Sequence, residues 1–144
     1  MNTKEIIALL PYTDPFLFVD EITEVTEHAI KGSYTFKEES YFYKGHFKDH
    51  PVTPGVILTE CMAQIGLVCL GIYLLKDKAA LDTMQVAFTS ADVSFLKPVY
   101  PNEKVTVVSE VSYFRFNKLK CDVKLYNEAN ELICNGALAG VFKI

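Results

Sequence analysis

Apolar and polar positions alternate along much of the chain, and one long stretch is apolar almost throughout. Residues 16–25 and 29–36 are rich in apolar and β-branched side chains and are predicted to be strands, with a turn at residues 26–28. The second half contains further strand-like runs at residues 84–96, 104–115, 119–126 and 131–142. In the third of these runs apolar residues alternate with lysine and aspartate, which predicts one buried and one solvated face.

Residues 53–75 form the most informative stretch, because almost every position is apolar. Thr53 is a good N-cap and Pro54 suits the first helical position, where a missing N–H costs nothing. We therefore predict a helix about 30 Å long. A helix that is apolar all round lies in a protein core or in a membrane. Glu60 and Gln64 favour the core and no membrane span, since a lone carboxylate is costly in lipid.

A short helix is predicted at residues 2–10, where Asn2 is the cap and Glu5 completes a capping box. The 144 residues correspond to one ordinary domain, so we expect residues 1–144 to share a single core. The economical arrangement is α+β: a curved, mostly antiparallel sheet of about six strands wrapped around the one long apolar helix.

Composition narrows the functional classes. Half the residues are apolar and 12% are aromatic, so an ordered domain is expected. A net charge of −4 argues against nucleic acid as the main partner. The apolar run at residues 6–10 is too short for a signal peptide. No C-x-x-C pair is present and the cysteines have apolar neighbours, which predicts buried free thiols and a reducing, cytoplasmic setting. The cysteines are Cys61, Cys69, Cys121 and Cys134.

The loop at residues 37–53 is long, aromatic and aperiodic, which is typical of a functional loop. It carries His46 and leads into the predicted helix. The first helical turn presents unpaired backbone N–H groups from Gly55 and Val56. Glycine there lets a ligand approach the backbone closely. The partial positive charge of the helix start suits a carbonyl oxygen that becomes negative during a reaction.

Glu60 and Gln64 are four residues apart and therefore share one face of the helix, where they could form a hydrogen bond. Burial raises the pKa of a carboxyl group, so Glu60 is a candidate acid. With His46 as a candidate base, the parts form a proton-transfer site. They fit removal of a proton next to an activated carbonyl, with loss of a leaving group from the neighbouring carbon.

Structural interpretations of the same residues stay open. A histidine in a Gly-x-Phe loop often has a structural role, and a carboxylate on an apolar helix can be a paired core residue. His46, Asp49 and His50 could also bind a metal ion, but no second pair of ligands is visible. We therefore expect no metal.

Several motifs, taken in order, resemble the FabZ-type 3-hydroxyacyl-[acyl-carrier-protein] dehydratases of fatty-acid synthesis. They are Leu10-Pro11 with Pro15-Phe16-Leu17-Phe18-Val19-Asp20, Gly45-His46-Phe47, Pro51 with Pro54-Gly55-Val56-Ile57, Glu60-Cys61-Met62-Ala63-Gln64, and Phe95-Leu96-Lys97-Pro98-Val99 with Pro101. Their order and spacing cover most of the chain. A glutamate at position 60 is similar to the FabZ type rather than to the dehydratase–isomerase FabA type.

The resemblance implies a hotdog fold and a hydro-lyase. Its substrate would be a (3R)-3-hydroxyacyl chain on the phosphopantetheine arm of an acyl carrier protein, and its product the trans-2-enoyl thioester. No cofactor would be required. The resemblance further implies a homodimer or a trimer of dimers, with His46 of one chain facing Glu60 of the other across the interface.

The resemblance also implies roles for single residues. His46 would take a proton from C2, and Glu60, oriented by Gln64, would protonate the leaving 3-hydroxyl group. The backbone N–H groups of Gly55 and Val56 would bind the thioester oxygen. The aromatic rings expected to line an acyl tunnel are those of Phe16, Phe47 and Phe95.

Two segments depart from the family pattern. Lys48-Asp49-His50 stands where the family usually has Pro-Gly-Arg, and Tyr12-Thr13-Asp14 stands where it has His-Arg between prolines. These departures suggest a specialised relative, for instance one that serves a polyene or pigment pathway. Lys44, Lys48 and Lys97 are expected to contact an acidic carrier protein. Two alternatives are a hotdog acyl thioesterase and a non-catalytic acyl-thioester-binding partner in a heterodimer.

Overall fold

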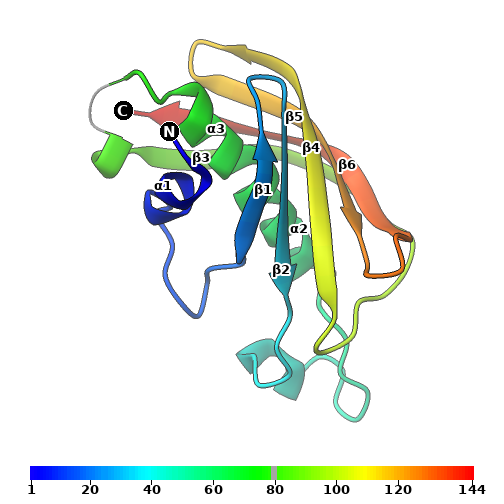
Figure 1. The fold of residues 1–144 in the computed structure, drawn as a ribbon. Helices are drawn as coiled ribbons and strands as arrows, with labels where there is room; N and C mark the ends of the chain where they lie inside the picture. Colours follow the sequence, from blue (N-terminus) through cyan, green and yellow to red (C-terminus); the bar gives the residue numbers. More distant parts are fainter. Residues whose placement is uncertain (79–80) are drawn as a thin grey trace.

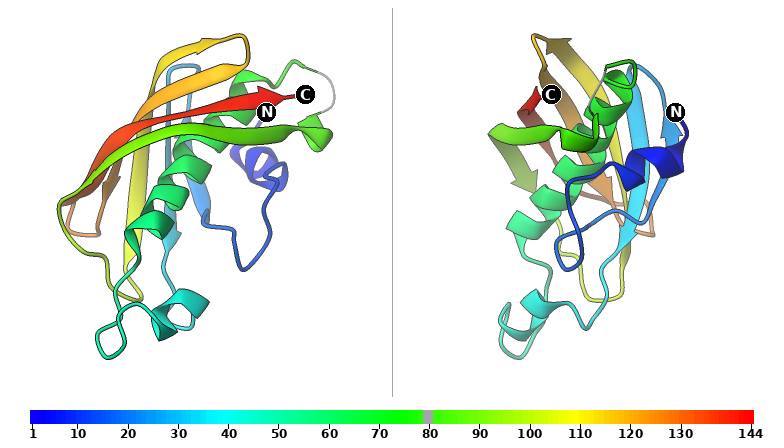
Figure 2. Two further views of the ribbon diagram at one scale, coloured as in Figure 1. Left: turned by 180° about the vertical axis from the view of Figure 1, so that it is seen from behind. Right: turned by 90° about the vertical axis from the view of Figure 1, so that its left-hand side faces the viewer.

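A computed structural model describes residues 1–78 and 81–144. Within these residues six antiparallel strands form one sheet in the order β1-β2-β4-β5-β6-β3. The strands are β1 (Glu21–Val25), β2 (Ala29–Thr35), β3 (Gln85–Phe95), β4 (Lys104–Arg115), β5 (Lys118–Tyr126) and β6 (Leu132–Lys143). The sheet curves around one long helix (Figures 1 and 2), so the expected α+β hotdog arrangement is confirmed.

The long helix consists of three consecutive segments. They are α2 (Gly55–Ala63), a π-helical stretch η2 (Gln64–Cys69) and α3 (Leu70–Leu74). The prediction of one regular helix missed the π-helical stretch, a feature that is frequent at functional sites. In this stretch the Gly66 carbonyl accepts a hydrogen bond of 2.8 Å from the Ser109 hydroxyl, which fixes the helix to β4. By length and composition the helix could cross a membrane, but 78% of that stretch is buried inside the protein.

Close packing holds the long helix in the concave face of the sheet. Gly71 is required there, because an added Cβ would lie 2.1 Å from the Phe142 ring.

The predicted alternation in β5 is confirmed by the buried side chains of its apolar positions, which are Leu119, Cys121, Val123 and Leu125. All four cysteines are free and buried, as predicted.

The first helix, α1 (Thr3–Ala8), begins as predicted. Glu5 N donates to the Asn2 side-chain oxygen at 2.9 Å, and Asn2 N donates to the Glu5 carboxylate at 3.4 Å. The strand predicted over residues 16–25 begins only at Glu21. The physical reason is that residues before it bond to the helix: Phe18 N donates to the Gln64 side chain at 2.8 Å, which removes it from a strand ladder.

The loop between β2 and α2 and the connection from α3 to β3 lie at opposite ends of the sheet (Figure 1). The loop after β2 contains a short 3₁₀ turn, η1 (Tyr41–Lys44), and lies beyond the start of α2. A second 3₁₀ turn, η3 (Leu81–Thr83), precedes β3. Between β4 and β5 the turn residues are Phe116 and Asn117. Their φ values of 51° and 59° match a two-residue hairpin turn.

Candidate active site

The start of the long helix leaves backbone donors open. The helix begins at Gly55, with Pro54 as an N-cap that forms no side-chain hydrogen bond. The first intrahelical bonds are from Ile57 N to the Pro54 carbonyl at 2.9 Å and from Leu58 N to the same carbonyl at 3.1 Å. In the part of the chain that the structure describes, no acceptor bonds the N–H of Gly55 or Val56. These groups are therefore available to a ligand.

The prediction that Thr53 caps this helix is wrong. Its hydroxyl lies 2.6 Å from the Tyr43 hydroxyl, with which it forms a buried hydrogen bond. The prediction that Pro54 occupies the first helical position is also wrong, since the helix begins one residue later. Both errors have one cause: the side chain that could cap the helix is bound to a loop residue ten positions away.

Glu60 lies on the second turn of α2 and is held by Gln64. The Gln64 side-chain nitrogen donates to the Glu60 carboxylate at 2.9 Å, which confirms the predicted contact. Burial raises the pKa of Glu60, and the hydrogen bond from Gln64 partly offsets this by favouring the charged form. A carboxyl group with a raised pKa can act as a proton donor nearer to neutral pH.

Gln64 is fully buried, and its three side-chain hydrogen bonds are all directed to this region. Besides Glu60, its side-chain nitrogen donates to the Phe16 carbonyl at 3.0 Å, and its oxygen accepts from Phe18 N at 2.8 Å. Gln64 therefore ties the segment at residues 16–18 to the helix beside Glu60. The spacing of Glu60 and Gln64 predicted their contact, but it gave no sign of this second role.

His46 is oriented by a backbone carbonyl. Its Nδ1 lies 3.0 Å from the Val52 carbonyl oxygen. A carbonyl can only accept, so Nδ1 carries the hydrogen, and in the neutral imidazole the lone pair is then on Nε2. Val52 N donates to the His46 carbonyl at 2.9 Å, and the Phe47 ring stacks on the imidazole at 4.2 Å between centroids. The geometry therefore presents Nε2 as a potential base.

The open helix start, the Glu60 carboxyl group and the His46 imidazole all lie near one end of the long helix, but within the described part of a single chain they are not joined by hydrogen bonds. The loop that carries His46 lies beyond the N-terminal end of α2 (Figure 2). Glu60 is the sixth residue of that helix, one turn inside it. Among the described residues, no hydrogen bond connects His46 to Glu60. A site that uses both therefore requires substrate between them or a second chain.

The aromatic rings predicted to line a tunnel lie at separate places. Phe16, Phe47 and Phe95 are each between 41% and 60% exposed. Phe95 packs on Gly55, whose added Cβ would lie 3.2 Å from the ring. A groove of about 340 Å³ lies there, lined by Thr53, Gly55, Leu58, Phe95, Leu96, Lys97 and Pro98. Phe16 and Phe47 do not line this groove.

Tyr12 is a residue near Glu60 that the sequence did not identify. Burial, followed by the negative charge of Glu60, raises the pKa of Tyr12 to about 12. Its ring centroid lies 6.4 Å from that of Phe16. It also lines a mainly apolar groove of about 620 Å³ beside the start of β3, together with Met84, Val86 and Val141. Its position within a segment that departs from the family pattern was the only available signal.

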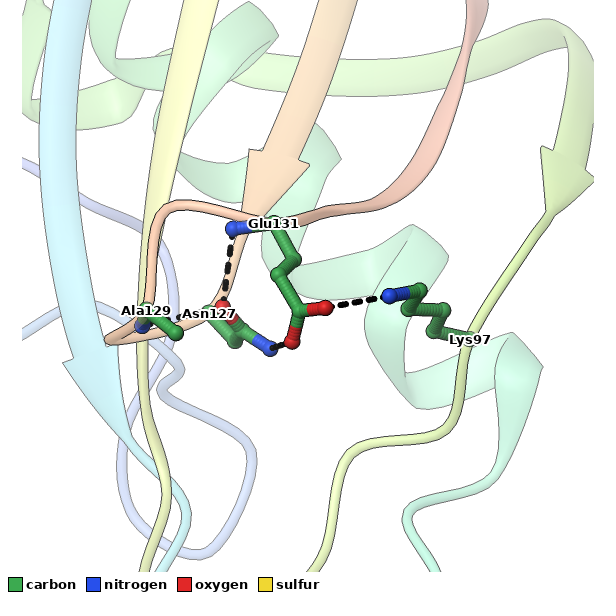
Figure 3. A network of polar contacts seen from close by, with 4 residues as sticks. All are labelled: Lys97, Asn127, Ala129 and Glu131. Carbon is green, nitrogen blue, oxygen red and sulfur yellow. Dashed lines mark hydrogen bonds and ion pairs between the residues drawn. The ribbon is translucent and has the colours of Figure 1, made fainter.

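Lys97 is already engaged by an acidic residue (Figure 3). Its ammonium forms an ion pair with Glu131, which Asn127 holds through bonds to both its side chain and its backbone N–H. An acidic partner would have to compete with Glu131 for Lys97. The structure records no side-chain partner for Lys44 or Lys48 among the described residues.

The possible metal ligands at residues 46–50 do not form a cluster. In the ranges 1–78 and 81–144, no three His, Cys, Asp or Glu side chains come together as a metal-binding group. Asp49 and His50 are exposed at the tip of the loop.

Comparisons with known proteins add to this geometry. The family model described as FabA-like domain matches residues 10–137. A 3-hydroxyacyl-[acyl-carrier-protein] dehydratase FabZ from Petrotoga mobilis is 36% identical over 121 residues, covering 83% of both chains. The FabZ of Clostridioides difficile is 34% identical over 142 residues, covering 96% of this chain and 94% of the relative.

Solved structures support the fold. A hypothetical thioesterase with coenzyme A from Streptococcus pneumoniae superposes with a TM-score of 0.66 at 14% identity, covering 85% of this chain and 84% of that one. A thioesterase from Haemophilus influenzae gives a TM-score of 0.62 at 19% identity, with coverage of 85% and 77%. At these identities the likeness concerns the fold alone. The sequence matches are decisive, and this chain belongs to the FabA-like family, as a FabZ-type dehydratase.

Proposed function

We propose that this protein dehydrates (3R)-3-hydroxyacyl thioesters on acyl carrier protein to trans-2-enoyl thioesters, in fatty-acid or related polyene and lipid biosynthesis. One observation carries the proposal: a carboxyl group with a raised pKa lies one turn from a helix start whose backbone donors are open. A thioester oxygen needs such donors when it becomes negative, and a hydroxide leaving group needs such an acid.

The proposed reaction begins at C2. His46 Nε2 removes the C2 proton, and the charge that develops on the thioester oxygen is stabilised by the N–H groups of Gly55 and Val56. Glu60 donates its proton to the 3-hydroxyl group as the C3–O bond breaks. The C2=C3 bond forms and water leaves. The cycle ends with a protonated His46 and an ionised Glu60, and proton return to Glu60 resets the site.

We propose that the working unit contains at least two chains. Within the described residues β3 pairs only with β6, so its other edge is unpaired. Phe88 on this strand is 45% exposed, and Val56 on the first helical turn is 76% exposed. An unpaired edge beside exposed apolar side chains favours association with a second copy. His46 of one chain would then face the partner subunit's Glu60, in a homodimer or a trimer of dimers.

Mixing two inactive variants tests the shared site. We expect His46→Ala and Glu60→Ala each to abolish turnover while the fold persists. If both residues act across a two-fold interface, refolding the two variants together gives about a quarter of wild-type activity, because half the dimers are mixed and each has one intact site. No recovery would contradict a site shared between chains.

We further propose a soluble cytoplasmic enzyme that receives its substrate from the carrier protein. The long helix would be the core of the domain and not a membrane span, because its surface is largely buried. Lys44, Lys48 and Lys97 remain the proposed carrier contacts, with Glu131 as a competitor at Lys97.

The deciding experiment uses a short (3R)-3-hydroxyacyl chain on carrier protein. We expect conjugated enoyl thioester, detected by absorbance and mass, and its loss in His46→Ala. Release of free carrier thiol would instead indicate the thioesterase. A substrate that stays bound and unchanged, across several chain lengths and with coenzyme A as the alternative carrier, would indicate a non-catalytic partner.

A further inference from the structure

A buried hydrogen bond joins the two ends of the segment 43–53, which carries His46. The Tyr43 hydroxyl lies 2.6 Å from the Thr53 hydroxyl. The two residues are only 5% and 4% exposed, so neither hydroxyl can readily exchange its partner for bulk water. Burial raises the pKa of Tyr43, against the opposite effect of the Thr53 hydrogen bond, so the phenol stays neutral. An unpaired buried hydroxyl is costly, and each hydroxyl therefore holds the other.

Thr53 is connected directly to the groups that orient His46. Its own N–H donates to the Val99 carbonyl at 2.8 Å, which fixes its backbone. The preceding residue, Val52, supplies the carbonyl that binds His46 Nδ1 and the N–H that binds the His46 carbonyl. Fixing Thr53 at both its backbone and its side chain therefore restrains Val52, and through it the imidazole.

Thr53 also stands where its side chain could close the helix start. Threonine hydroxyls accept hydrogen bonds from the N–H two residues later, in local turns that compete with other partners. For Thr53 that N–H belongs to Gly55, which has no acceptor among the described residues. The Tyr43 bond occupies the Thr53 hydroxyl instead.

We propose that Tyr43 is a positioning residue: it holds the Thr53 hydroxyl away from the helix start, which keeps the Gly55 N–H open to the thioester oxygen, and it steadies the carbonyl that orients His46. This inference rests on the proposed function, through the roles given to Gly55 and His46. Tyr43 itself touches no reacting atom.

The test is a cycle of Tyr43→Phe, Thr53→Val and the double variant. Tyr43→Phe leaves a free Thr53 hydroxyl beside Gly55, so we expect kcat to fall about tenfold. Thr53→Val removes the hydroxyl altogether and should cost only about threefold, from the looser His46 loop. The double variant should return to the level of Thr53→Val, because no hydroxyl then competes for Gly55. A structural defect alone would make the double variant no better than Tyr43→Phe.

Tyr41→Phe is the matched control. Tyr41 lies in the same 3₁₀ turn, is half-exposed, and has no recorded hydrogen bond from its hydroxyl among the described residues. We expect wild-type kcat in this variant. Thermal unfolding of all the variants checks that each is folded at the assay temperature.

A second readout does not require turnover. We expect hydrogen exchange of the Gly55 amide, followed by NMR, to slow in Tyr43→Phe and to stay at the wild-type rate in Thr53→Val and in the double variant. Equal kcat in Tyr43→Phe and Thr53→Val, or an unchanged Gly55 amide, would overturn the role given to Tyr43. A wild-type protein that forms no enoyl product would contradict the proposed function, while the amide measurement would still decide the inference about Tyr43.

Discussion

The starts of α1 and α2 differ in how they treat the unpaired backbone N–H groups of the first helical turn. At α1, Asn2 and Glu5 satisfy each other's backbone N–H groups, so the helix start is closed by its own side chains. At α2 the cap residue forms no side-chain bond, and the N–H groups of Gly55 and Val56 lack acceptors in the described chain. An open helix start is less stable by itself. The comparison indicates that the start of α2 is locally less stable than that of α1 but leaves backbone donors that a ligand can bind.

Burial allows α2 to begin without a cap. Ile57 and Leu58 in its first turns are buried, whereas α1 buries only Ile6. Most helical stability in proteins comes from such packing, so a helix inside the core can leave its first donors open. The nearby carboxyl groups differ in the same way: Glu5 is exposed and completes a cap, while Glu60 is partly buried and has a raised pKa.

The largest effect is expected from the carboxyl group near the open helix start. Glu60→Gln keeps the shape and the capacity to hydrogen-bond but cannot donate a carboxyl proton, so we expect kcat to fall about 1,000-fold. Steady-state dehydration of a carrier-bound substrate measures this. Glu5→Gln is the matched control, since glutamine also completes a capping box, and its kcat should equal that of the wild type.

Glu60 should also affect how the unfolding free energy depends on pH. Its pKa is raised in the folded protein, so folding favours the protonated form. The associated stability is present below the unfolded-state pKa and is lost as the pH rises through the folded-state pKa. The unfolding free energy of the wild type should therefore fall relative to Glu60→Gln as the pH rises above about 4.5. Parallel pH profiles from denaturant unfolding would contradict the raised pKa.

A methyl group at the open helix start should affect binding more than folding. In Gly55→Ala the new Cβ meets the Phe95 ring at 3.2 Å and narrows the approach to the backbone N–H, although alanine favours the helix. We expect kcat/KM to fall about tenfold with little change in Tm. Gly45→Ala is the control, because its Cβ would meet no atom within 4 Å. Equal losses of kcat/KM in the two variants would mean that the space beside Gly55 has no specific role in binding.

Gln64→Leu should mainly change stability and the pH profile. It removes the partners of Phe16 and Phe18, so the unfolding free energy should fall by about 2–4 kcal/mol. It also removes the hydrogen bond that lowers the Glu60 pKa, so the alkaline limb of kcat should move to higher pH. Ser109→Ala, which loses one bond to the same helix, should lose about 1 kcal/mol and leave that limb in place. If the alkaline limb of the kcat profile stayed at the same pH in Gln64→Leu, Gln64 would not influence the pKa of Glu60.

Features set by spacing within one element could be predicted, and features set by distant contacts could not. The α1 cap, the alternation in β5 and the bond between Glu60 and Gln64 depend on residues two to four positions apart. The open start of α2 depends on Tyr43, ten residues from Thr53.

The late start of β1 has a similar origin. It depends on a bond between Phe18 and Gln64, 46 residues apart, and the position of Tyr12 near Glu60 is another product of the fold. Local patterns contain no information on such partners. The order of the family motifs, and not spacing alone, suggests the roles that we propose for His46 and Glu60.

The smallest functional effect is expected at the closed helix start. Asn2→Ala removes the side-chain acceptor for Glu5 N, so the unfolding free energy should fall by about 1 kcal/mol. No described contact links Asn2 to Glu60, His46 or Gly55, and kcat should therefore be unchanged. Denaturant unfolding and the dehydration assay on one preparation measure both quantities. A loss of kcat without a loss of stability would mean that the two helix starts are coupled, and that closure at α1 helps to keep α2 open.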